Sequence, residues 1–310
     1  VGDGSAEVLA MSGDLMSAHR INDPAKLTQQ AKDLRTHLAA GRTAEAIDSG
    51  NSLRVTLLDA PSKTLAGKGR YLLLVDGVLA AISPQVFPES QEGLRYLADI
   101  RTITLAASAG QALLPQGAAP ERYEPEFLGI SAQDPKEIRD SDGNLLSTEV
   151  VQISHRFDKD MRIVLQGNAV TSADFDQNAG GSRFIHLVPE SVGDKGNLFF
   201  GDQVLSLAQI RALDLSAVSV VLSTTLEPAL ASRWVQAFRA CGVRSIVVRT
   251  WDVPAADRSK FFFSAYEGLI QHGDPNRSFQ QTRKSLMDQQ ALLGEEGPRW
   301  WGPYLTFGRP

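Results

Sequence analysis

The sequence predicts an α/β fold whose mainly parallel sheet is covered by helices on both faces. In the second half of the chain, short apolar runs alternate with amphipathic stretches of helical period, a pattern typical of parallel sheets. The clearest unit is the apolar run 219–222, which leads through a short loop into a helix that Pro228 opens and Gly242 closes. With 310 residues, 43% of them hydrophobic, the chain is long enough to bury a substantial core.

The first half of the chain is less regular. We expect residues 1–24 to form a poorly patterned segment, because they are small and polar and show little periodicity. Apolar residues recur at helical spacing from Leu27 to Leu38 and predict a helix over 25–46. Asp76-Gly77 stands between two apolar runs and predicts a hairpin. Strands are expected over 70–75, 78–82, 101–105 and 126–130.

A loop-like stretch divides the chain. Residues 132–147 are rich in Asp, Pro and Gly and predict a boundary between an N-terminal half, 25–135, and a C-terminal half, 136–310. A small hairpin is expected over 193–201. The C-terminal half is predicted to contain strands over 162–165, 183–188, 219–222 and 245–249, and helices over 205–213, 228–240, 257–269 and 278–292.

Composition excludes several classes of function. The net charge of −5 and the pI of about 5.6 do not favour nucleic acid or an anionic membrane as a partner. No apolar run approaches the ~20 residues of a membrane span. Cys241 is the only cysteine, so there is no intrachain disulfide and no cysteine cluster for a metal, and we expect a cytoplasmic location. No metal or cofactor motif occurs, and we expect neither.

Two features bear on a possible active site. Loops at the carboxyl ends of parallel strands are where α/β sheets place their chemistry, so residues 223–227 should lie over a site, yet they include no cysteine or histidine. His186 lies within an apolar strand whose end faces the same site, although such a histidine is more often structural than catalytic. The glycines in 179–182 precede a strand rather than open a helix, which predicts a turn and not a phosphate-binding loop.

An ordered set of segments resembles the CHAT domain family, a bacterial caspase-like family that is related to separase proteases and is commonly fused to tetratricopeptide (TPR) repeats. The resemblance covers residues from about 25 to 310 and implies a caspase-like three-layer sandwich with an N-terminal subdomain. Its landmarks are 71–79, Phe184-Ile185-His186-Leu187, 201–206, 212–215, Val220-Val221-Leu222-Ser223, 242–247, Trp251, Tyr266 and 300–304.

The same resemblance implies that the catalytic residues of the family are replaced here. Active members have a strand ending in Leu-Ser-Ala-Cys-Glu-Thr, and Thr225 stands at the cysteine position. Their histidine segment has the form His-x-Ala-x-His-Gly, so His186 matches the first histidine and Glu190 the catalytic one. An acidic residue expected shortly after the tryptophan strand is matched by Ala255.

Side-chain chemistry points the same way. A cysteine near neutral pH is partly thiolate, whereas a threonine hydroxyl ionises at far higher pH and needs a positioned base. Glutamate, with an ordinary pKa of about 4.3, is a weak base and carries no proton for the leaving group at pH 7. Burial could still raise the pKa of Glu190 enough for it to act.

We therefore weigh two hypotheses. The first is a catalytically inactive pseudoprotease that binds a protein or peptide as a scaffold or regulatory module, with an N-terminal TPR region of the same polypeptide as one candidate partner. The second is a hydrolase that uses Thr225 or Ser223 as nucleophile and His186 or Glu190 as base. The residues expected to line a binding groove are His186, Ser223, Glu227 and Trp251.

Overall fold

An eight-stranded sheet forms the centre of the protein. The computed structural model describes residues 6–12, 15–65, 70–74, 82–89, 95–106, 123–132, 148–167, 170–293 and 298–308. Neighbouring strands pair in parallel except β12 and β13, which are antiparallel. Along the sheet the strands follow the order β3 (Arg70–Leu74), β4 (Thr102–Ala106), β13 (Tyr304–Phe307), β12 (Ser245–Arg249), β11 (Ser219–Thr225), β7 (Phe184–Val188), β5 (Phe127–Ser131) and β6 (Arg162–Gln166).

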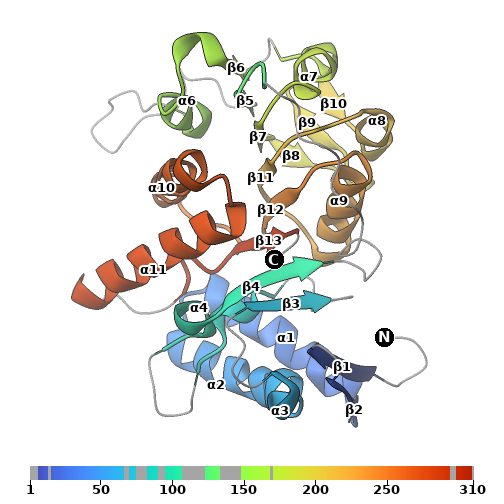
Figure 1. The fold of residues 1–310 in the computed structure, drawn as a ribbon, viewed down its shortest axis with the longest axis vertical. Coiled ribbons are helices and arrows are strands. Elements are labelled where there is room, and N and C mark those ends of the chain that lie inside the picture. Colours follow the sequence, from blue (N-terminus) through green and yellow to red (C-terminus); the bar gives the residue numbers. More distant parts are fainter. Residues whose placement is uncertain are drawn as a thin grey trace.

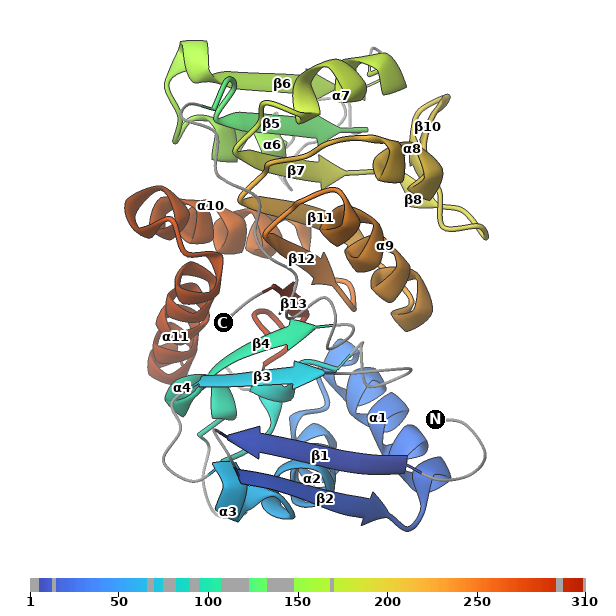
Figure 2. The same cartoon turned by 45° about the vertical axis from the view of Figure 1, so that its right-hand side comes forward.

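Helices cover both faces of this sheet, as the sequence predicts (Figures 1 and 2). One face carries α6 (Glu149–Ser154), α10 (Ala255–His272) and α11 (Pro275–Leu293). The opposite face carries α7 (Ser172–Ala179), α8 (Leu207–Ala212) and α9 (Pro228–Ala240). The strands at the centre, β5, β7, β11 and β12, are buried almost throughout, which explains why they read as continuous apolar runs rather than alternating ones.

The unit from β11 to β12 forms for the reasons visible in its sequence. Pro228 stands in the first turn of α9, where its missing N–H is no loss, and Trp234 and Phe238 bury one face of the helix. Gly242 follows the helix at φ +96°, and a Cβ there would lie 2.4 Å from the Leu215 carbonyl oxygen. Cys241 is buried and its thiol contacts the Ile210 carbonyl oxygen, so this cysteine belongs to the core.

The N-terminal region differs from the sequence prediction. Instead of a poorly patterned segment, β1 (Ala6–Ser12) and β2 (Leu15–Ile21) form an antiparallel hairpin. One face of the hairpin is buried at Ala10 and Ile21, and small residues in both strands had obscured that alternation. The single helix expected over 25–46 is two helices, α1 (Pro24–Ala39) and α2 (Thr43–Arg54), because the chain turns at Gly41 with φ +71°.

Short elements complete the described chain. A π-helical stretch (Val55–Asp59) and α3 (Ser62–Leu65) follow α2, and α4 (Leu97–Ile100) precedes β4. The hairpin expected over 193–201 is confirmed as part of a small antiparallel sheet of β8 (Ser191–Val192), β9 (Leu198–Phe200) and β10 (Gln203–Leu205). The predicted Asp76-Gly77 hairpin and nearly all of the predicted boundary at 132–147 lie outside the described residues. No helix in the described ranges combines the length and apolarity that a membrane span requires.

Candidate functional site

The site begins with a row of residues across three neighbouring strands. Thr225 at the end of β11 pairs with Arg249 at the end of β12, and Arg249 pairs with Tyr304 at the start of β13. Strands in a sheet lie about 4.8 Å apart, so Arg249 is the immediate neighbour of both Thr225 and Tyr304. The register of β11 shifts between Leu222 and Thr225, and this irregularity brings Thr225 opposite Arg249.

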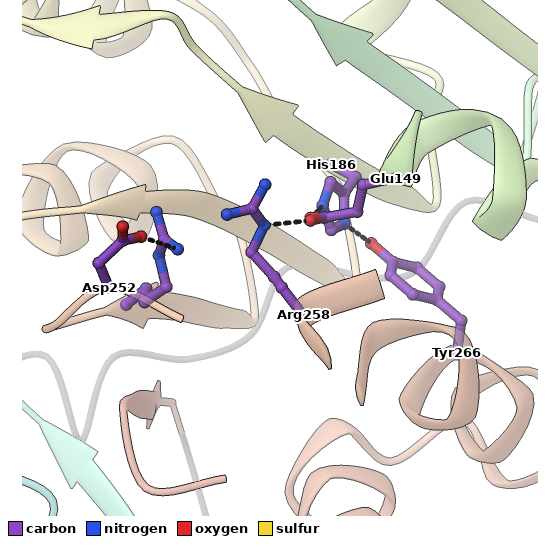
Figure 3. A network of polar contacts seen from close by, with 6 residues as sticks. Glu149, His186, Asp252, Arg258 and Tyr266 are labelled. Carbon is purple, nitrogen blue, oxygen red and sulfur yellow. Dashed lines mark hydrogen bonds and ion pairs between the residues drawn. The ribbon is translucent and has the colours of Figure 1, made fainter. Parts of the chain in front are cut away.

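A polar network lies on the face of the sheet that α10 covers. His186 Nε2 lies 2.6 Å from Glu149 Oε1, and because an ionised carboxylate only accepts, His186 donates this bond. The other ring nitrogen, Nδ1, lies 3.2 Å from the Tyr266 hydroxyl. Arg258 Nε donates to the second carboxylate oxygen of Glu149. Figure 3 shows that α6, β7 and α10 each contribute to this network, in which the Glu149 carboxylate lies between His186 and Arg258.

The electrostatics of the network depend on Glu149. Burial alone would raise the pKa of this carboxyl, but the hydrogen bond and attraction from His186, together with Arg258, lower it to about 2. For Arg258, burial opposes the charged form, yet the nearby Glu149 carboxylate raises its pKa above the ordinary value. Burial raises the pKa of the Tyr266 hydroxyl well above 10. Glu149 and Arg258 therefore form a buried ion pair at neutral pH.

The structure brings some of the predicted site residues together. Ser223 and His186 both lie beside Glu149: the Ser223 hydroxyl contributes to the lowered pKa of that carboxyl without reaching hydrogen-bond geometry. The Thr225 Oγ1 atom is fully buried and has no hydrogen-bond partner among the described residues. Ser223, Thr225 and His186 therefore belong to one polar cluster, although no hydrogen bond between described residues links Thr225 to His186.

The other predicted residues lie apart from that cluster. Glu190 is exposed next to β8, where its backbone N–H donates to the Phe199 carbonyl oxygen. Trp251 is buried, and its indole N–H donates to the Arg299 carbonyl oxygen at 3.0 Å. The carboxylate of Glu227 points into solvent and pairs with Arg35 of α1 at 3.1 and 3.2 Å.

The contact with α1 was not visible in the sequence. Besides Glu227, Arg35 donates from Nε to the carbonyl oxygen of Thr250, which follows β12. The Arg35 hydrogen bond also lowers the pKa of Glu227. One arginine of an N-terminal helix therefore holds the two loops that leave β11 and β12, the strands whose ends form the site.

Sequence analysis did not identify five of these polar residues as site residues: Glu149, Arg249, Arg258, Tyr266 and Tyr304, of which the two tyrosines entered only as landmarks of the family resemblance. Arg249 had a usable signal, because it is a charged residue that ends a buried apolar strand at the edge where chemistry is expected. Glu149 had none, since it lies on a six-residue helix and its partners are 37 and 109 positions away. The described residues contain no group of three or more His, Cys, Asp or Glu side chains that could hold a metal ion.

Comparison with known proteins identifies a family for this chain. The family model described as "CHAT domain" matches residues 48–309. No curated protein matches the chain. Two solved structures of the Saccharomyces cerevisiae separase–securin complex match with TM-scores of 0.48 and 0.49 at 12% and 11% sequence identity, and in each the match covers 77% of this chain. The chain spans only 16% and 15% of those chains.

Proposed function

We propose that this chain, which belongs to the CHAT domain family, is a non-catalytic member that binds a protein partner as a scaffold or regulatory module of a larger protein. The observation that carries this proposal is the environment of Thr225, which stands where the resemblance places the nucleophilic cysteine. Its hydroxyl oxygen is buried and, within the described part of the chain, has no hydrogen-bond partner. A nucleophile needs a base within about 3.2 Å of its hydroxyl, directly or through one water, and the described residues place none there.

The two candidate bases support the proposal further. Both ring nitrogens of His186 are already engaged, one by Glu149 and the other by Tyr266. Glu190, which stands at the position of the catalytic histidine, is exposed to solvent next to β8, apart from the buried Thr225 hydroxyl. These observations favour the non-catalytic interpretation over a hydrolase that uses Thr225 with His186 or Glu190.

An exposed apolar surface supports a protein partner. Leu9 and Met11 of β1 and Met16 of β2 share the outward face of the hairpin, where Met11 and Met16 lie directly opposite each other. These three side chains are 65–70% exposed. We call them the hairpin face. Contiguous exposed apolar side chains of this kind mark protein-interaction surfaces.

We assign the hairpin face to a TPR region N-terminal to this chain in the same polypeptide. The hairpin precedes residues 48–309, the part that the family model matches, and it lies at the end of the molecule away from α6 and β6 (Figure 2). A covalently linked repeat region would benefit from a high effective concentration, so a modest apolar surface suffices to hold it.

The test measures complex formation between this chain and the separately expressed TPR region by calorimetry. We expect binding that the double variant Leu9→Ser, Met16→Ser weakens about tenfold or more, since two exposed apolar side chains of this size contribute on the order of 1–3 kcal/mol. Leu74→Ser is the matched control, because Leu74 is also an exposed leucine on a strand but lies outside the hairpin. Absence of a complex, or equal loss in both variants, would contradict the assignment.

A further inference from the structure

We propose that Arg249 anchors a binding site for an acidic side chain, the aspartate or glutamate of a bound peptide, at the ends of β11, β12 and β13. This inference deepens the proposed function, since it names the chemistry that the degenerate site recognises. It concerns a different surface from the hairpin face, so the two can fail separately.

Several buried polar atoms at the ends of β11, β12 and β13 have no hydrogen-bond partner among the described residues. Thr225 Oγ1, Arg249 Nε and Tyr304 OH belong to three side chains in cross-strand register, and none has a hydrogen-bond partner among the residues that the structure describes. Buried polar groups are normally satisfied, so exceptions in three neighbouring residues require an explanation, and a partner from outside the described chain is one.

Among the described residues, Arg249 has one carboxylate partner, Asp252, which is exposed to solvent. Arg249 Nη1 donates to Asp252 Oδ1 at 2.8 Å, and the two residues are only three positions apart. The Arg249 side chain is 7% exposed, whereas that of Asp252 is 83% exposed. A buried guanidinium is therefore reached by a carboxylate that is itself exposed to solvent, and a single hydrogen bond joins the two side chains.

A second buried guanidinium, that of Arg258, lies near Arg249. Burial and the neighbouring Arg258 both lower the pKa of Arg249, which indicates that its charge is incompletely balanced. Arg258 is bound to Glu149, and Glu149 is bound to His186 on its other oxygen. The buried Glu149 carboxylate thus pairs with Arg258, whereas the carboxylate that pairs with Arg249 is that of the exposed Asp252.

These features select a carboxylate as ligand. A guanidinium offers up to five N–H donors in a plane that matches a carboxylate, and the Thr225 and Tyr304 hydroxyls can each donate one more hydrogen bond. A cationic side chain would meet Arg249 and Arg258 directly and be repelled. The Asp252 carboxylate already occupies one donor of Arg249, so an incoming carboxylate takes its place there.

The experiment titrates this chain with terminally blocked Ala-Ala-Xaa-Ala-Ala peptides, with Asp, Asn or Lys as Xaa, and follows binding by calorimetry. We expect the Asp peptide to bind about tenfold or more tightly than the Asn peptide, as a charge-assisted hydrogen bond implies, and the Lys peptide not to bind. Acetate is titrated in parallel. Equal binding of the Asp and Asn peptides, or acetate binding as tightly as the Asp peptide, would overturn the proposal.

Two variants test the roles of Arg249 and Asp252 in binding the Asp peptide. Arg249→Gln should abolish the preference for Asp. Because this buried substitution can impair folding, the decisive variant is Asp252→Asn, which leaves a well-exposed position intact and removes the competing carboxylate. It should tighten binding of the Asp peptide about threefold or more. The matched control is Glu267→Gln, another exposed carboxylate in an arginine pair, which should leave the affinity unchanged. An unchanged or weaker affinity in Asp252→Asn contradicts the proposal.

Discussion

The polar cluster on the α10 face of the sheet has two parts that differ in how fully their atoms are partnered. In the first part, Glu149, His186, Arg258 and Tyr266 engage one another from α6, β7 and α10. In the second part, Thr225 and Tyr304 have hydroxyls without partners among the described residues, and Arg249 relies on an exposed aspartate. Both parts occupy the same face of neighbouring strands, so position in the fold does not explain the difference.

The partnered part of the cluster stabilises the fold, whereas the unpartnered part is suited to binding a ligand. A buried network in which every group has a partner holds α6 and α10 against the sheet, and removing one member leaves a charge uncompensated. A row of unpartnered groups contributes little to stability, and its atoms remain available for a ligand. The predictions below test this division, beginning with the largest expected effect.

A substitution that breaks the partnered part of the cluster should lower the free energy of unfolding the most. Glu149→Gln removes the carboxylate on which Arg258 and His186 converge, and we expect it to lower the free energy of unfolding by about 3–5 kcal/mol. Urea denaturation measures this loss. Glu267→Gln removes an exposed carboxylate from a surface ion pair with Arg156 and should change the free energy by less than about 1 kcal/mol. Equal effects of the two variants would show that the network is not a stabilising unit.

The same network should make stability depend on pH in acid. The pKa of Glu149 is about 2 in the folded protein and 4.5 ordinarily, so the folded state favours the ionised form. Its contribution is fully present well above pH 4.5 and is lost as the pH falls from about 5 through the folded pKa of about 2, on the order of 3 kcal/mol in total. Urea denaturation across that window should show the loss in the wild type. The difference between wild type and Glu149→Gln isolates this one carboxyl, and a constant difference would contradict the account.

A smaller effect is expected where α1 holds the loops of the site. Arg35→Ala removes one hydrogen bond to the buried Thr250 carbonyl oxygen and a partly exposed pair with Glu227. We expect a loss of about 1–2 kcal/mol in urea denaturation. Lys32→Ala, an exposed cation on the same helix, should change the free energy by less than about 0.5 kcal/mol. A larger loss in Lys32→Ala than in Arg35→Ala would show that the contacts of Arg35 with Glu227 and Thr250 do not stabilise the protein.

In the unpartnered part the expected effect is close to zero. Thr225→Val replaces a buried hydroxyl without a described partner by a methyl group of similar size, and we expect a change within about 0.5 kcal/mol or a slight stabilisation. Thr171→Val removes a hydroxyl that accepts from the Asp174 N–H at the start of α7, and should cost about 1 kcal/mol. A loss in Thr225→Val as large as in Thr171→Val would mean that the Thr225 hydroxyl has a partner.

Much of the fold followed from local sequence signals, whereas half of the site did not. The strands at 219–222 and 245–249 and the helix at 228–240 were predictable because burial, Pro228 and Gly242 act within a few residues. Gly41 carried a signal for the break between α1 and α2 that helical periodicity concealed.

The partnered network could not be predicted from the sequence, for a different reason. Glu149, His186 and Arg258 meet only after α6, β7 and α10 pack together, and no periodicity marks a buried acid on a short helix. The resemblance to a family located His186 and Thr225, but it could not reveal that both nitrogens of His186 are engaged or that the Thr225 hydroxyl is buried.

The central claim is that the family's nucleophile position is occupied here by a residue that does not react. It is tested most directly by incubating wild-type protein and Thr225→Ala with a fluorogenic library of peptide and ester substrates and comparing turnover. We predict no turnover in the wild type that Thr225→Ala removes. Turnover that disappears in Thr225→Ala would contradict the account and establish the protein as a hydrolase.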